Sequence, residues 1–138
     1  MKIYLASSFG LIEKIEEVCK ALEAEGHEIL VRWWNRAHLK KKFAVLEADV
    51  FYQEAECKYA FERDLQGVKD CDALVFVASD VIKPYCGASV EMGMAFALGK
   101  PVYSIGVFKN SAMYYGIIRC QDLEEVISRL SLSTEALK

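Results

Sequence analysis

A continuous apolar run, from Ala73 to Ala78, constrains the fold of this chain more than any other stretch. It reads Ala-Leu-Val-Phe-Val-Ala and is bounded by Asp72 before it and Ser79 after it. A strand without polar alternation is typical of the centre of a parallel sheet, where helices cover both faces. The loop that follows, residues 79–85, leaves the carboxyl end of that strand, where ligands bind in open α/β sheets.

Strand and helix patterns alternate along the rest of the chain. Strands are predicted at residues 2–6, 27–34 and 102–105, and helices at about 11–25, 52–69, 87–98 and 122–130, with residues 131–138 fraying. The basic segment 35–48 is predicted to be either a short helix or a flap that covers a pocket. This alternation predicts a single α/β domain, residues 1–138, with a mostly parallel sheet of four or five strands and helices on both faces.

Apolar spacing assigns an inner face to each long helix. Trp33 and Trp34 are expected on opposite sides of the second strand, where core packing is the commoner role for either and stacking on a planar base is the alternative. The predicted inner faces are Ile12, Ile15, Val18, Cys19 and Leu22 in the first helix, Ala55, Tyr59, Phe61 or Ala60, Leu65 and Val68 in the second, and Val90, Met94, Ala97 and Leu98 in the third.

Composition excludes several function classes. The 138 residues are 54% hydrophobic and carry a net charge of −3, so nothing favours binding to a nucleic-acid polymer, and the apolar surplus is consistent with an oligomer interface. The five cysteines have no metal-ligand spacing, which favours reduced thiols in a cytoplasmic protein over a zinc site or disulfides. We expect no signal peptide and no membrane span. The basic cluster at residues 32–42 is either a solvated face or a rim that attracts anions.

Residues 86–101 form the stretch with the most chemical content. The helix predicted here ends at Gly99, because Lys100-Pro101 cannot continue it. Glu91 is expected in its first turn, among small and apolar neighbours that leave room for a ligand. From residue types alone, the commoner explanation is that Glu91 stabilises the helix dipole; the alternative is a carboxylate that points into a cleft.

Two other places can carry chemistry. The turn Ser7-Ser8-Phe9-Gly10 follows the first strand and offers hydroxyls and backbone amides to an anion or a sugar, or simply caps the next helix. It has neither the glycine spacing of a dinucleotide site nor the lysine of a phosphate-binding loop. Asp64, followed by Leu65, is either a solvated helix carboxylate or a second functional carboxylate.

The sequence resembles the nucleoside 2-deoxyribosyltransferase family, which includes the 2'-deoxynucleoside 5'-phosphate N-hydrolases. The resemblance covers about residues 1–130. It rests on four ordered matches, which are Ile3-Tyr4, Asp64-Leu65, the pattern Gly87-Ala88-x-x-Glu91-x-Gly93-x-Ala95-x-Ala97-x-Gly99-Lys100-Pro101, and the segment Asn110 to Met113. It implies a flavodoxin- or Rossmann-like fold and cleavage of an N-glycosidic bond without a metal or cofactor.

The resemblance also implies roles for individual residues. Glu91 would attack the anomeric carbon, Tyr4 would hydrogen-bond that carboxylate, and Asp64 would serve in proton transfer near the departing base. The segment with Asn110 and Ser111 would be lent by a neighbouring subunit, which implies a homodimer or higher homo-oligomer with shared active sites. The substrate-binding residues implied are Ser7, Ser8, Phe9, Gly10, Tyr85, Gly87, Ser89, Asn110, Ser111 and Met113.

Two residues depart from the family pattern. Tyr85 stands where the transferases tend to have Asp and the N-hydrolases Ser, and Ala88 stands where Thr is common. Base preference, transfer against hydrolysis, and free nucleoside against 5'-monophosphate therefore stay open. Other classes also stay open, namely a module that binds nucleotides without turnover, a glycosidase of ribonucleotides, and a structural homo-oligomer.

Overall fold

The structure, a computed structural model, describes residues 1–79, 85–106 and 112–136. Its described residues form one sheet of five parallel strands in the order β2-β1-β3-β4-β5. The strands are β1 (Lys2–Ala6), β2 (Glu28–Leu30), β3 (Ala73–Val77), β4 (Val102–Ile105) and β5 (Ile118–Cys120). The predicted fold class, a single α/β domain with a parallel sheet, is confirmed. In these parts of the chain no helix is long and apolar enough to cross a membrane.

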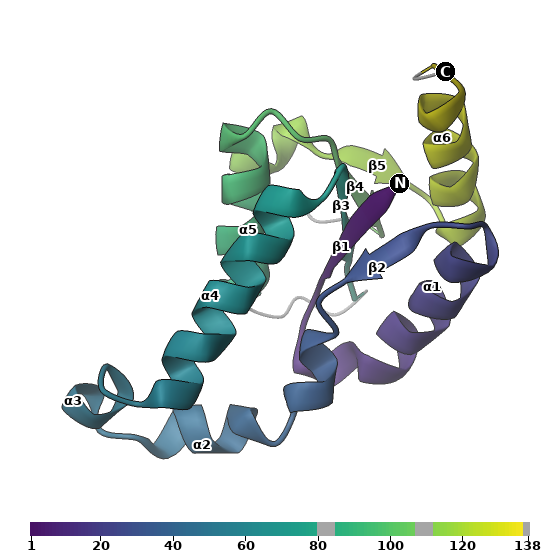
Figure 1. The fold of residues 1–138 in the computed structure, drawn as a ribbon. Coiled ribbons are helices and arrows are strands. Elements are labelled where there is room, and N and C mark those ends of the chain that lie inside the picture. The colour runs from purple at the N-terminus through teal and green to yellow at the C-terminus, as the bar shows by residue number, and fades with distance from the viewer. Residues whose placement is uncertain (80–84, 107–111, 137–138) are drawn as a thin grey trace.

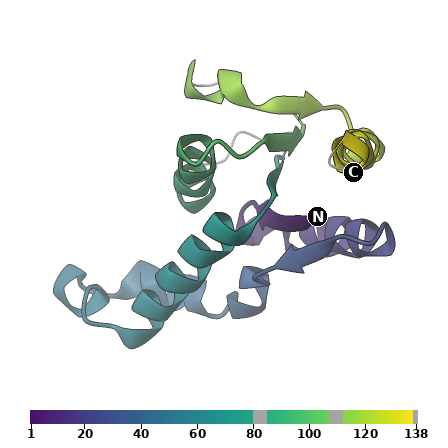
Figure 2. The ribbon, with the colours of Figure 1, turned by 45° about the horizontal axis from the view of Figure 1, so that its top comes forward.

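Helices cover both faces of the sheet. Helices α1 (Ile12–Ala24) and α6 (Leu123–Ala136) lie on one side, and α4 (Ala55–Asp70) and α5 (Cys86–Ala97) lie on the other (Figures 1 and 2). Two short helices, α2 (Leu39–Val45) and α3 (Ala48–Phe51), form an arm beside the amino-terminal end of α4. The segment 35–48, for which the sequence predicted either a short helix or a flap, is therefore largely helical.

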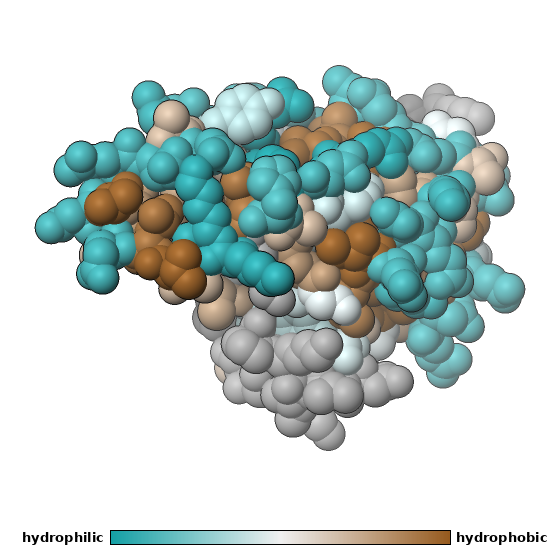
Figure 3. Space-filling model, turned by 90° about the horizontal axis from the view of Figure 1, so that it is seen from below, coloured by the Kyte–Doolittle hydropathy of each residue, from teal (hydrophilic) through white to brown (hydrophobic). Residues whose placement is uncertain are grey.

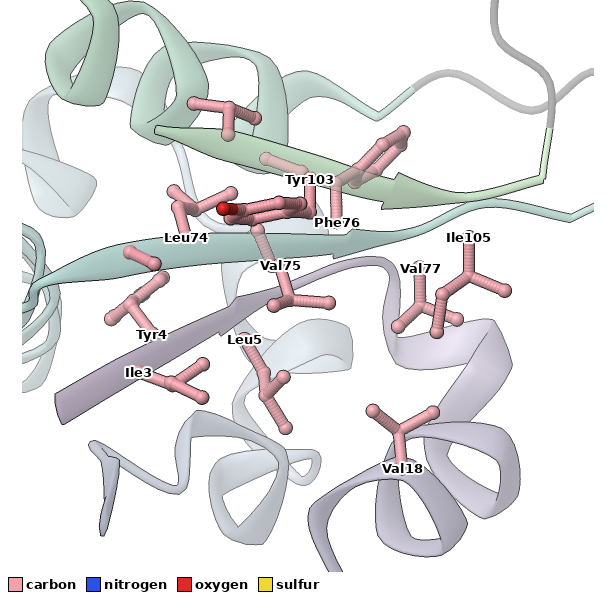
Figure 4. Packing of buried hydrophobic residues seen from close by; sticks show 14 of the residues in the cluster. Ile3, Tyr4, Leu5, Val18, Leu74, Val75, Phe76, Val77, Tyr103 and Ile105 are labelled. Carbon is pink, nitrogen blue, oxygen red and sulfur yellow. The ribbon is translucent and has the colours of Figure 1, made fainter. Parts of the chain in front are cut away.

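The core is built on β3, whose five residues are all buried, as the continuous apolar run predicts. Leu5, Val75 and Val77 lie on the side of the sheet from which Val18 of α1 packs (Figure 4). Since side chains alternate along a strand, Tyr4 points to the opposite side, toward α4 and α5. The two faces of the sheet therefore differ. One face packs as hydrophobic core against α1, and the other carries Tyr4, one of the predicted site residues.

The strand order creates a crevice between β1 and β3. The connection that leaves β1 runs through α1 on one face of the sheet, and the connection that leaves β3 runs through α5 on the other face. The two connections therefore diverge between these neighbouring strands. Such switch points are where open α/β sheets bind ligands. The Ser7 hydroxyl, just after β1, donates a hydrogen bond of 2.7 Å to the Val77 carbonyl at the end of β3, which holds the two strand ends together.

The second strand is shorter than predicted, because it ends at Leu30. Val31 has a left-handed backbone (φ 48°), a conformation that β-branched residues rarely adopt and that costs about 1–3 kcal/mol. It turns the chain into a 3₁₀ helix, η2 (Trp33–Arg36), so both tryptophans leave the sheet. The Trp33 indole then donates to the Leu5 carbonyl at 2.6 Å, which satisfies a β1 oxygen beyond the end of β2.

The predicted inner face of α5 is wrong, and that of α4 is right at Val68 but wrong at Tyr59 and Phe61. The α1 face is confirmed, with Ile15, Val18, Cys19 and Leu22 buried. In α5, however, Ala88, Met92 and Ala95 are buried, whereas Val90 is 63% and Leu98 50% exposed. Because α5 is apolar on nearly every side, spacing cannot tell which side meets the sheet. In α4 the buried residues are Gly67 and Val68, and Tyr59 and Phe61 are exposed.

The arm and the carboxyl-terminal part of the chain contain features that the sequence analysis did not predict. Apolar surface gathers over α2 and α3, where Val45 and Val50 are exposed (Figure 3). The short edge strand β5 has only three residues and was not predicted as a separate strand. The last helix, α6, continues to Ala136, six residues beyond its predicted end. All five cysteines are free thiols.

Gly67 allows the Tyr4 ring to lie against α4. A Cβ atom added at Gly67 would stand 2.6 Å from Val31 Cγ2 and 2.9 Å from Tyr4 Cδ2, closer than real Cβ contacts. Tyr4 itself is fully buried, so its ring has no room to move aside. The absence of a side chain at Gly67 therefore fixes where the Tyr4 hydroxyl sits.

We predict that Gly67→Ala destabilises the fold by about 1–3 kcal/mol through overpacking, although alanine is the better helix former by about 1 kcal/mol. The measurement is urea denaturation followed by circular dichroism. The matched control is Gly93→Ala in α5, where a Cβ would meet nothing within 4 Å and should be neutral or slightly stabilising. Equal effects of the two changes would contradict the contact with Tyr4.

Candidate active site

A cavity of about 260 Å³ lies at the carboxyl edge of the sheet, at the switch point between β1 and β3. The loop after β1, the helices η2, α2 and α4, and the start of α5 all contribute to it. In the described parts of the chain, no group of three His, Cys, Asp or Glu side chains can hold a metal ion. The lining residues are Ser7, Ser8, Phe9, Trp33, Arg36, Leu39, Phe43, Ala60, Asp64, Tyr85, Cys86, Gly87, Ala88 and Glu91.

Glu91 lines this cavity from the second turn of α5, not from the first turn as predicted. Since α5 begins at Cys86, Glu91 is its sixth residue. The dipole of a helix acts within its first turn, so a helix-stabilising role does not explain a carboxylate at this position. Small residues precede Glu91, and its Oε1 atom would lie 3.9 Å from a Cβ at Gly87. The position fits a carboxylate that faces a ligand.

Burial governs the electrostatics of Glu91. The side chain as a whole is half-buried, but its Oε2 atom is completely buried and has no hydrogen-bond partner among the described residues. Burial raises the pKa of the carboxyl to about 8, while the nearby Tyr4 hydroxyl and Arg36 act in the opposite direction. At neutral pH the Glu91 carboxyl therefore favours its protonated form.

Tyr4 lies beneath Glu91 and does not line the cavity. Its hydroxyl is also buried without a hydrogen-bond partner among the described residues. Burial and the nearby carboxyls of Glu91 and Asp64 raise the pKa of Tyr4 well above its usual range, so the phenol keeps its proton. The hydroxyl is close enough to lower the pKa of Glu91, but no hydrogen bond joins the two groups in this conformation.

Asp64 faces the same cavity from α4 and forms an ion pair with Arg36 of η2. The Arg36 Nη2 atom donates to Asp64 Oδ1 at 2.6 Å, and the two side chains are 18% and 30% exposed. Burial raises the pKa of Asp64, and the guanidinium opposes that rise. The two acidic groups thus have different surroundings, because Asp64 has a cationic partner and Glu91 has none in direct contact.

The structure brings together five of the ten predicted substrate-binding residues. These five, which line the cavity, are Ser7, Ser8, Phe9, Tyr85 and Gly87. Tyr85 is buried, and its hydroxyl accepts a hydrogen bond of 2.6 Å from the Ser79 amide.

The other predicted positions lie elsewhere. Gly10 is outside the cavity lining, and so is Ser89, whose hydroxyl lies 2.8 Å from that of Tyr114. Asn110 and Ser111 fall outside the residues that the structure describes, and the same holds for the side chain of Met113.

Sequence reasoning did not assign several of the lining residues. For Trp33 the sequence favoured core packing, with stacking on a base as the alternative; the residue is buried, and it also lines the cavity while its ring meets Phe9 edge to face. Leu39 and Phe43 come from the segment that was predicted to cover a pocket. Arg36 was seen only as one member of a basic cluster, and nothing in the sequence indicated that it would pair with Asp64.

Comparisons with known proteins agree with this geometry. Residues 3–123 match the model of a family described as nucleoside 2-deoxyribosyltransferase. A 2-deoxyribosyltransferase from Bacillus psychrosaccharolyticus has a similar structure, with a TM-score of 0.62, 25% identity, and 92% of this chain and 90% of that chain covered. A CMP N-glycosidase of Clostridium botulinum shares the fold, with a TM-score of 0.59, 17% identity, and 95% and 99% covered. No curated protein matches the sequence significantly.

We predict that Glu91→Gln stabilises the fold at neutral pH. The folded pKa of about 8 lies above the ordinary value of 4.5, so between these values the folded state binds a proton that the unfolded state has released. Stability of the wild type is therefore fully present below pH 4.5 and falls as pH rises toward 8. At pH 7 the free energy of unfolding of the variant should exceed that of the wild type by at most about 3 kcal/mol. The difference is reduced because the side chain borders the open cavity, where solvent screens its charge.

The measurement is urea denaturation of both proteins across this pH range. Glu124→Gln, at an exposed position of α6, serves as the control and should leave the pH dependence of the wild type unchanged. A stability difference between wild type and Glu91→Gln that does not change with pH would contradict the raised pKa.

Proposed function

Because the chain belongs to the nucleoside 2-deoxyribosyltransferase family, whose members cleave N-glycosidic bonds and transfer deoxyribosyl groups, we propose that Glu91 is its nucleophile. The substrate is a 2'-deoxynucleoside or its 5'-monophosphate. The observation that carries this proposal is the pair of carboxyls in one cavity, Glu91 and Asp64, whose surroundings differ. Different surroundings are how two carboxyls acquire different roles in one reaction.

The first step is attack by the Glu91 carboxylate on the anomeric carbon. The bond to the base breaks as the new carbon–oxygen bond forms, through a transition state with oxocarbenium character, as in retaining glycosidases. The attack requires the ionised form, so Glu91 must first release its proton to solvent, and the leaving base takes up a proton of its own. Tyr4, which keeps its own proton, then has an ionised oxygen to which it can donate, and this hydrogen bond supports the carboxylate.

The second step removes deoxyribose from Glu91. In transfer, a second nucleobase attacks the same carbon and leaves Glu91 free; in hydrolysis, water does so. Asp64, which lines the cavity from α4, serves in proton transfer to the departing base and from the incoming acceptor. Both routes use the chain's own side chains and need no cofactor.

The lining of the cavity suits the two parts of such a substrate. Ser7, Ser8 and the exposed Gly87 provide hydroxyls and open backbone, which suit a sugar or a 5'-phosphate. Trp33 and Phe43 provide apolar surface, which suits a base. A ribonucleotide substrate is the alternative, because the fold is shared with a protein described as a CMP N-glycosidase.

We further propose that the protein is a homo-oligomer whose subunits meet at α5. This helix carries one charged residue, Glu91, and Val90, Gly93 and Ala97 expose an apolar stripe at helical spacing. A helix that is apolar on all sides is normally buried. A second copy on this stripe would lie close to the cavity, as shared active sites require. The five free cysteines support a cytoplasmic location.

We predict that the protein releases free base from deoxynucleosides or their 5'-monophosphates, and that Glu91→Ala abolishes the release. The assay separates products by chromatography, with each substrate tested with and without a second free base. Exchange into the added base would identify a transferase, and release without exchange an N-hydrolase. CMP and the other ribonucleotides are tested in parallel.

The control variant for this assay is Glu124→Ala, which leaves the cavity untouched. Release of base by Glu91→Ala at the wild-type rate would overturn the nucleophile assignment. If the wild type turns over none of these compounds but is stabilised by them in thermal unfolding, the protein is a nucleotide-binding module.

We predict that Val90→Lys converts the oligomer to a monomer, because it places a charge in the apolar stripe. Analytical ultracentrifugation measures the mass in solution. Val45→Lys, an exposed position on the arm, is the matched control and should keep the wild-type mass. A wild type that is strictly monomeric at working concentration would contradict the proposed interface.

A further inference from the structure

Arg36 is the only cationic side chain among the described residues that line the cavity. It shares the lining with apolar residues, since Trp33 lies in the same helix η2 and the next helix, α2, contributes Leu39 and Phe43. Asp64, its ion-pair partner, comes from α4. A guanidinium at the edge of an apolar slot is well placed to meet the polar rim of a flat ring.

The ion pair with Asp64 uses only part of the hydrogen-bonding capacity of Arg36. One nitrogen, Nη2, donates to Asp64 Oδ1 at 2.6 Å, and Arg36 makes no other hydrogen bond within the described part of the chain. The guanidinium has five N–H donors in a rigid plane. Asp64 thus fixes the plane, and the remaining donors are available to a ligand oxygen in the cavity.

We propose that Arg36 binds the departing base and makes the site select pyrimidines, whose carbonyl oxygen adjoins the glycosidic nitrogen. This inference rests on the proposed glycosidic cleavage and goes beyond it by naming the class of base and the residue that recognises it. When the bond to the sugar breaks, the electron pair moves into the base ring and reaches that carbonyl oxygen. Arg36 then donates to an oxygen that is gaining negative charge.

The proposal also fits the state of Asp64. Burial raises the pKa of Asp64, whereas the Arg36 guanidinium stabilises its ionised form, which has no proton to donate. If Arg36 stabilises the charge on the oxygen, the base can leave as an anion and take its proton afterwards, from Asp64 or from water. In purines the charge from the glycosidic nitrogen spreads to ring nitrogens, and no carbonyl oxygen lies at the corresponding place.

The test is a leaving-group series with three variants. The first, Arg36→Lys, keeps the charge and loses the planar fork. The second, the double change Arg36→Met with Asp64→Asn, removes both charges and so leaves no buried carboxylate unpaired. The third, Arg63→Met, is the matched control, because Arg63 acts on Asp64 only at a distance and does not line the cavity. The substrates are 2'-deoxyuridine, 5-fluoro-2'-deoxyuridine and 2'-deoxyadenosine, each also as the 5'-monophosphate.

We expect wild-type kcat/KM to be at least about tenfold higher for the pyrimidines. The double variant should lose about 10- to 100-fold with deoxyuridine and clearly less with the fluorinated compound, whose base is the more stable anion. The kcat/KM of Arg36→Lys should lie between those of the wild type and the double variant, and the kcat/KM of Arg63→Met should equal that of the wild type. A loss that is equal for all bases, or a wild-type preference for adenine, would overturn the proposal.

A binding measurement separates failure of this inference from failure of the proposed function. Labelling of Cys86, an exposed thiol at the cavity, is followed with and without uracil or adenine. If no substrate is turned over, selective protection by uracil that is lost on removing Arg36 still supports recognition of pyrimidines. Absence of turnover together with protection that is absent, or unaffected by Arg36, would overturn it.

Discussion

The burial of one carboxyl, Glu91, is the constraint on which the site depends. A carboxylate that loses water without gaining a direct partner is unstable, and the protein responds by raising the pKa of Glu91 to about 8. In the proposed mechanism, the same desolvation would make the ionised form a stronger nucleophile once a substrate is bound. The fold thus tolerates a local loss of stability at the position of the proposed nucleophile, a trade that is common at active sites.

The neighbours of Glu91 are arranged so that this burial is possible. Tyr4 comes from β1 and is fixed by the close approach of Gly67 in α4, so its hydroxyl is held beside the carboxyl before any ligand binds. The strained turn at Val31 packs against the same glycine and redirects the chain into η2. One tightly packed contact thus links a buried hydroxyl with the helix that carries Arg36.

The sequence predicted the order of the elements and the convergence of Tyr4, Asp64 and Glu91, because the apolar run of β3 and the ordered motifs are local signals. Prediction from the sequence failed where contacts between distant segments determine the local structure. The end of β2 depends on the backbone of Val31, and the inner side of α5 cannot be inferred when both sides are apolar. Glu91 was placed one turn too early because helix α5 begins at Cys86. Pairing of Arg36 with Asp64 joins residues 28 positions apart, beyond the reach of any local pattern.

The ionisable groups of the cavity, Glu91, Asp64 and Arg36, influence one another electrostatically. Asp64 raises the pKa of Glu91, whereas Arg36 lowers the pKa values of both carboxyls, so the guanidinium partly offsets the repulsion between them. A base that draws Arg36 toward its own oxygen would weaken the ion pair and leave Asp64 readier to hold a proton. In the proposed mechanism, binding of the base and the proton affinity of Asp64 would thus be coupled through one guanidinium. That coupling would prepare Asp64 for its proposed proton transfer only when a substrate occupies the site.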